Sequence, residues 1–173
     1  MLSQASRTEI DAHLKKYPPE RKRSAVLPAL HIAQRQYGYV TEDAVNEIAD
    51  MLDLAPTEVR SVAGFYSLFY KHKVGRHVIH FCNDLPCALR GADEFMARLC
   101  KRLGVDAQGG TTTDGEFTLE PAMCLAACDK APMMQVDLDY FENLTDEKVD
   151  QILADIRSGR IKLDKAAVIK SEL

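Results

Sequence analysis

The sequence predicts an α+β protein made of a small helical bundle followed by an α/β domain. Throughout residues 1–70, apolar side chains recur at helical spacing in four short segments. From residue 76 onward, short runs rich in β-branched and aromatic residues alternate with two amphipathic helices, in the order β-α-β-β-β-α. We place the boundary near 71–76, KHKVGR, so that residues 1–75 form a helical domain and residues 76–173 form the α/β domain with a C-terminal tail.

The four helices of the first domain are indicated by their starts and stops. Thr8, with Asp11 three positions on, resembles a capping box and predicts a first helix that runs up to Lys16. Gly38 is expected to end the second helix. This second helix is expected over 24–37. The third is expected to begin after Thr41, and the fourth at Pro56. Short amphipathic helices in a row favour a small bundle, because each buries its apolar face against its neighbours.

The second domain combines strands with helices. The run HVIHFC, residues 77–82, predicts a strand. The segment 87–104 predicts one continuous amphipathic helix, with Leu89 and Cys100 on its apolar stripe. A polar loop is expected over 105–116, followed by strands over 117–124, 131–137 and 139–144. The last two strands are expected to form a hairpin. Thr145 is expected to cap a final helix.

The composition restricts the kinds of partner and compartment. The chain has 173 residues, 46% of them apolar, and a net charge of -4. Nucleic acid is not expected as a partner, because phosphate binding needs a basic surface. The apolar runs are too short to cross a bilayer and the N-terminus lacks the pattern of a secretory signal, so we expect a cytoplasmic protein without direct membrane insertion.

Four of the five cysteines occur in two pairs that follow predicted strands. Cys82 and Cys87 come after the first strand, and Cys124 and Cys128 come after the second. Loops beyond the carboxyl ends of strands are where α/β proteins build sites. If the two strands are neighbours in one sheet, four thiolates converge on one place, as a [2Fe–2S] cluster requires.

Other uses of four cysteines compete with this interpretation. A structural zinc site also takes four thiolates, usually in pairs spaced C-x₂₋₄-C, so zinc stays open on spacing alone. Disulfides are disfavoured in a reducing cytoplasm, and the C-x-x-C of a thioredoxin-type redox pair is absent from the sequence. Cys100, in contrast, lies on the apolar stripe of a helix and is expected to be a core residue.

Three segments carry a resemblance to a known family. HVIHFCNDLPCALRGADE, FTLEPAMCLAACDKAPMMQVD and YFENLTDEKVDQIL resemble the thioredoxin-like [2Fe–2S] ferredoxins found as E subunits of bacterial NADH:quinone oxidoreductase, respiratory complex I. The helical segment upstream is also similar to that family, and the resemblance covers about residues 20–158. It implies a thioredoxin-like fold for the second domain, with one [2Fe–2S] cluster bound by Cys82, Cys87, Cys124 and Cys128.

The resemblance also implies partners and a role. The chain would be an electron-transfer protein that exchanges single electrons with the flavin on a partner, the F subunit, which binds FMN and NADH. Further subunits of the peripheral arm would be neighbours, on the cytoplasmic side of the inner membrane. Arg90 and Lys130 are candidates for positive charge near the cluster. The equivalent subunit of an NAD-linked hydrogenase or formate dehydrogenase, and a zinc-stabilised interaction module, are the alternatives.

One position departs from the family. The family usually has glycine between the last two cysteines, as C-L-G-x-C, where this chain has Ala126. A glycine there suggests a positive φ angle, which alanine adopts at a cost. We expect Ala126 to be tolerated if its backbone takes a right-handed conformation.

Overall fold

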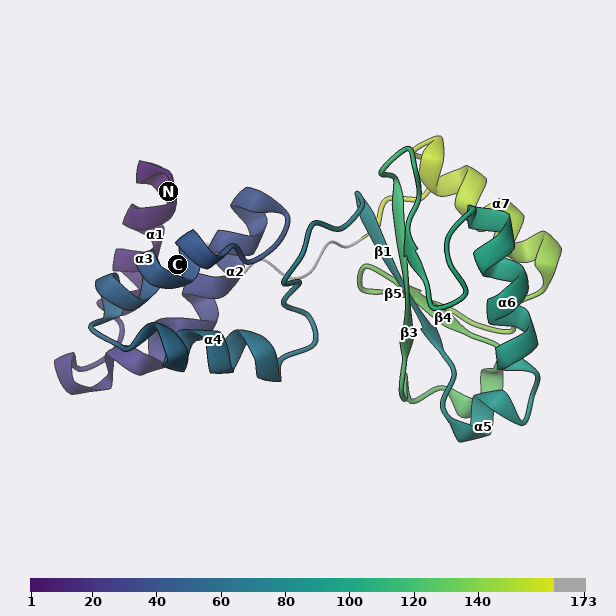
Figure 1. Ribbon diagram of the computed structural model, residues 1–173, viewed down its shortest axis with the longest axis horizontal. Helices are drawn as coiled ribbons and strands as arrows, with labels where there is room; N and C mark the ends of the chain where they lie inside the picture. The colour runs from purple at the N-terminus through teal and green to yellow at the C-terminus, as the bar shows by residue number, and fades with distance from the viewer. Residues whose placement is uncertain (164–173) are drawn as a thin grey trace. The chain divides into compact units, whose positions relative to one another are not determined.

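The computed structural model describes residues 1–163, and these form two compact units (Figure 1). One unit spans Met1–Lys73 and the other begins at Val74. Helices make up the first and a helix-covered sheet makes up the second, so the predicted α+β class is confirmed. Residues 164–173, which include most of the expected C-terminal tail, lie outside the described residues.

The unit Met1–Lys73 is a bundle of short helices around one apolar core. Its elements are α1 (Gln4–Leu14), the 3₁₀ helix η1 (Pro19–Ala25), α2 (Val26–Tyr37), α3 (Glu42–Leu52) and α4 (Pro56–Phe65). Each α-helix contributes a fully buried side chain to the core, among them Ile10, Leu30, Ile48 and Val59. Burying these apolar faces is the main force that holds short helices together.

Most of the predicted helix ends are confirmed, and the first is wrong. Thr41 caps α3, since its Oγ1 accepts from Ala44 N at 3.1 Å, and Gly38 ends α2 with φ 80°. The helix α1, however, begins four residues before Thr8. Ser3 caps it, and Thr8 instead donates to the carbonyl of Gln4 from inside the helix.

The second unit is a five-stranded mixed sheet with helices. Its elements are β1 (His77–Cys82), α5 (Leu85–Ala88), α6 (Ala92–Leu103), β2 (Gly110–Thr111), β3 (Phe117–Ala122), the 3₁₀ helix η2 (Cys128–Lys130), β4 (Met134–Val136), β5 (Asp139–Phe141) and α7 (Asp146–Arg157). The strand order is β2-β3-β1-β4-β5, and only β1 and β3 run parallel. The predicted hairpin of β4 and β5 and the Thr145 cap of α7 are confirmed.

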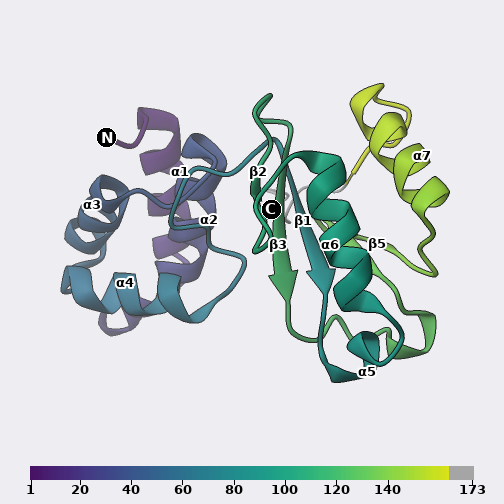
Figure 2. The ribbon, with the colours of Figure 1, turned by 45° about the vertical axis from the view of Figure 1, so that its right-hand side comes forward.

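Helices α6 and α7 cover one face of this sheet (Figure 2). Ile79 and Phe81 of β1 point into the core between the sheet and these helices, and Phe81 stacks on Phe95 of α6 with ring centroids 5.6 Å apart. Arg102 of α6 pairs with Asp150 of α7 at 3.0 Å on the outer side. The packed face therefore anchors β1 up to its last residue, which is one of the paired cysteines.

The expected continuous helix over 87–104 is wrong. The chain instead makes one turn of helix, α5, and then passes through Gly91 with φ 84° before α6 begins. The expected apolar stripe includes Leu89, but the break turns this side chain outward and leaves it 81% exposed. The short strand β2 lies in the expected loop 105–116.

A helix that crosses a bilayer needs about 20 predominantly apolar residues. Among residues 1–163, no helix is both long enough and apolar enough to do so.

Candidate metal centre

The two cysteine pairs meet because β1 and β3 are parallel neighbours. Their register pairs Cys82 with Ala122, so both strands end at the same edge of the sheet. Just beyond that edge, Asn83 N donates to the carbonyl of Ala122 at 3.1 Å and joins the two departing chains. Figure 1 shows α5 beyond this edge. The expectation that the two predicted strands are neighbours is confirmed.

The two cysteines of the inner cysteine loop, residues 82–87, are part of the hydrophobic core. Cys82 ends β1 and Cys87 lies in α5, and each is 1% exposed. Asp84 precedes α5, and its carbonyl accepts from Cys87 N at 2.9 Å. This loop is held by regular hydrogen bonds on one side and apolar packing on the other.

The outer cysteine loop, residues 124–128, is irregular and open to solvent. Cys124 is exposed and Cys128 is partly exposed at the start of η2. Within the loop, Ala126 N donates to Cys124 Sγ at 3.4 Å. An amide that points at sulfur in this way stabilises a thiolate and any metal bound to it.

Ala126 adopts the conformation that favours glycine. Its φ is 60°, so the condition under which alanine was expected to be tolerated, a right-handed conformation, is not met. The other non-glycine residues with positive φ in the described chain are Asp53, Asp137 and Asn143, which have short polar side chains. Alanine lacks that compensation and costs about 1–2 kcal/mol in this region. The amide needs this turn to reach the sulfur of Cys124, so the backbone geometry is kept despite the side chain.

The four thiols affect one another's pKa values. Burial raises the pKa of Cys87 to about 12, and the hydrogen bond with Cys82 and its charge also act in this direction, followed by the charges of Cys128 and Cys124. Burial also raises the pKa of Cys128, as do the charge and hydrogen bond of Cys124 and the charge of Cys82. The thiols of each loop thus affect one another, and the charges of one pair also act on the other pair.

This arrangement suits a two-iron cluster. Four thiols converge as two pairs, and a [2Fe–2S] cluster bound by four cysteines takes two thiolates on each iron. The chemistry of the donor set, four cysteine thiols from two loops, fits such a cluster.

Two basic residues predicted to lie nearby behave differently. Arg90, just after α5, donates from Nη1 to the carbonyls of Asp129 at 2.8 Å and Cys128 at 3.4 Å. It therefore links the chain that follows the inner loop to the outer loop and brings a positive charge to the site. Lys130 pairs with Glu142 at 2.9 Å, which offsets its charge.

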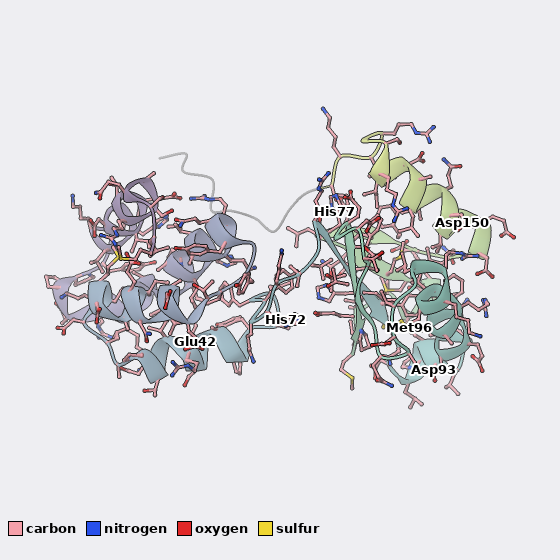
Figure 3. All side chains as sticks on the ribbon, turned by 45° about the horizontal axis from the view of Figure 1, so that its top comes forward. Glu42, His72, His77, Asp93, Met96 and Asp150 are labelled. Atoms are coloured by element: carbon pink, nitrogen blue, oxygen red, sulfur yellow. The ribbon has the colours of Figure 1, made fainter. Side chains whose placement is uncertain are left out.

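The histidines of β1 and the fifth cysteine take no part in the site. His77 lies at the start of β1 (Figure 3), at the opposite end from Cys82, and its Nδ1 is 2.6 Å from Asp137. His80 faces Glu120 on β3 at 3.7 Å. Cys100 is 3% exposed on α6, so its predicted place in the core is confirmed.

Sequence reasoning missed the exposed apolar side chains around the loops. Leu85, Leu89 and Met123 all point to solvent within three residues of a paired cysteine. The signal is present in the sequence, since bulky apolar residues stand in short connections where polar residues are usual. Helical periodicity instead favours a place for Leu89 in the core.

A sheet whose edge gathers four thiols from two loops defines an iron–sulfur protein of the ferredoxin type. The model of the thioredoxin-like [2Fe-2S] ferredoxin family matches residues 10–157, so the chain belongs to that family. Its cofactor is accordingly one [2Fe–2S] cluster.

Comparison with known proteins gives two kinds of relative. The chain is 43% identical over 141 residues to the E subunit of the NADH-quinone oxidoreductase of Rickettsia felis, covering 81% of this chain and 84% of the relative. It is 41% identical over 152 residues to the E subunit of the Escherichia coli enzyme of the same name, covering 88% and 90%. An NAD+-reducing [NiFe]-hydrogenase in the air-oxidized state shares the fold, with a TM-score of 0.65 and 22% identity, over 83% of this chain and 24% of that chain.

Proposed function

We propose that this chain is the E subunit of an NADH-quinone oxidoreductase and carries single electrons by means of its [2Fe–2S] cluster. The observation that carries the proposal is the meeting of four thiols, in two pairs, at one edge of the sheet. The relatives that are 41–43% identical to the chain over the aligned residues are E subunits of NADH-quinone oxidoreductase, and the alignment covers most of their length.

The residues of the site would bind the cluster and offset its charge. Cys82 and Cys87 would bind one iron from the core side, and Cys124 and Cys128 would bind the other from the solvent side. When bound, the cluster supplies a centre that gains or loses one electron. Four thiolates make that centre strongly negative, and the amide of Ala126 and the guanidinium of Arg90 offset part of the charge.

The electrons would come from a partner. The F subunit of the same complex would bind NADH and FMN, and this chain would take single electrons from that flavin. Further peripheral-arm subunits would be neighbours, at the cytoplasmic face of the inner membrane. The chain itself supplies the thiolates and the protein surface, and it is not a complete enzyme alone.

Replacing one outer ligand tests the proposal. Cys124→Ala should abolish the electron paramagnetic resonance signal of the reduced cluster, because one iron loses a thiolate. Cys100→Ala is the matched control, since Cys100 is buried on α6 away from the paired thiols, and it should leave the signal intact. An unchanged signal in Cys124→Ala would show that the ligands are assigned wrongly.

The alternatives predict different results. A zinc-stabilised interaction module would purify colourless under anaerobic conditions with zinc bound, whereas the [2Fe–2S] protein is coloured and contains iron and sulfide. The equivalent subunit of an NAD-linked hydrogenase or formate dehydrogenase would have the cluster but purify with different partners. Metal analysis and the identity of the co-purified proteins therefore separate all three.

A further inference from the structure

Bulky apolar side chains surround the cysteine loops on their solvent side. Leu85 is 70% exposed, Leu89 is 81% exposed and Met123 is 77% exposed. Among the described residues of the second unit, the exposed large apolar side chains are these three and, on β5, the less open Tyr140. Three of the four therefore gather at one end of the sheet, and we call Leu85, Leu89 and Met123 the apolar rim.

The apolar rim comes from two segments that both adjoin the cysteine site. Leu85 and Leu89 are one turn apart around α5, where Leu89 N donates to the carbonyl of Leu85 at 3.0 Å, so their side chains lie on the same side. Met123 follows the last residue of β3, and its carbonyl is 3.5 Å from Cys82 Sγ. The rim thus includes the residue before the outer loop and the helix of the inner loop.

The burial of the cysteines distinguishes a closed side of the site from an open side. Cys82 and Cys87 are enclosed in the core, while Cys124 is exposed next to Met123 of the rim. A redox partner must approach the cluster closely, and the open side is the one that the rim borders. Charged residues of both signs, Asp84, Arg90 and Asp129, lie around it, and an apolar centre with a polar border is the composition of a protein interface.

We infer that the apolar rim is the docking surface for the flavin-carrying redox partner of this chain. This inference rests on the proposed function, which makes that partner the NADH-oxidising F subunit. On docking, the three rim side chains would enter apolar positions on the partner and exclude water from the path between flavin and cluster. Few residues at the centre of an interface carry most of its affinity, so single changes here should matter.

Binding of the holo-protein to the purified F subunit tests the inference. Leu89→Asp and Met123→Asp should each raise the Kd at least tenfold, because each would bury an unpaired charge in the interface. The visible spectrum of the cluster should stay unchanged, since both side chains are open to solvent and bind no metal. Tyr140→Asp is the matched control, because Tyr140 is exposed on β5 away from the loops, and its Kd should stay within twofold of the wild type.

Several results would overturn the inference. Unchanged affinity for the F subunit in both rim variants would overturn it. A loss of affinity in Tyr140→Asp as large as that in the rim variants would also overturn it. Loss of affinity in Phe65→Asp alone would place docking on the first unit, where Phe65 is 82% exposed at the end of α4. Rim variants that break a homodimer but bind the F subunit normally would assign the rim to a second copy of this chain. Failure of the proposed function is distinct, since the wild-type holo-protein would then not bind the F subunit.

Discussion

The two cysteine loops each supply two thiols but differ in burial and in backbone structure. The inner loop is closed into the core, with both thiols 1% exposed and α5 hydrogen-bonded behind them. The outer loop has an exposed thiol, a left-handed alanine and the short helix η2. The inner cysteines are thus part of the core, while the outer loop packs on the core through Leu125 and Ala127 and leaves Cys124 exposed.

Removal of the iron should reveal this difference most strongly. Without the cluster, amides of residues 124–128 should exchange with solvent about a hundredfold faster, because a cluster bound by all four cysteines would tie that loop to the buried Cys82 and Cys87. Amides of α5 should change by less than about threefold, since core packing holds them. Hydrogen exchange of the chelated and holo forms, measured by mass spectrometry, checks this.

The control for that experiment is in the same sample. Amides of α3 belong to the other compact unit and should exchange at equal rates in both forms. Equal acceleration in both cysteine loops would contradict the comparison and show that the inner loop also depends on the cluster.

Weakening the link between the loops should have the next largest effect. Arg90→Gln removes a charged donor to the carbonyls of Cys128 and Asp129, so loss of the cluster to a chelator should become about tenfold faster. It should also lower the reduction potential, because a nearby positive charge favours the more negative, reduced state.

Arg90→Lys separates these two roles. It keeps the charge and loses the forked geometry, so the potential should stay near that of the wild type while cluster loss still accelerates. Bleaching of the visible spectrum and a redox titration measure the two effects. A normal rate of loss in Arg90→Gln would show that the loops hold together without this side chain.

The smallest effect is expected at Ala126. Ala126→Gly relieves the cost of the left-handed conformation but makes the unfolded chain more flexible, so the net gain should be about 0.5–1 kcal/mol in the free energy of unfolding. Ala126→Val should destabilise by a larger amount, because a β-branched side chain fits this region less well. Chemical denaturation of the holo-protein measures both, and no gain from glycine would mean that the loop relaxes around alanine.

The parts of the molecule that could be predicted are those set by local patterns. Short apolar runs located β1 and β3, and the cysteines after them indicated a shared site. The break at Gly91 was missed because the apolar spacing continues across it, as if one helix ran through. The left-handed Ala126 could not be found from the residue itself, since alanine usually favours right-handed backbone, and its contact with Cys124 is seen only in the folded loop.

The parallel pairing of β1 with β3 also makes the site insensitive to the length of the chain between its halves. The thiols are aligned by a register in which Cys82 is opposite Ala122, and the connection from α6 to β3 contributes none of the four. Residues inserted at the exposed positions 106–108, before β2, would leave this register unchanged, and the four sulfurs would still meet. One residue inserted within β3 would shift the outer loop along the sheet and turn its cysteines away.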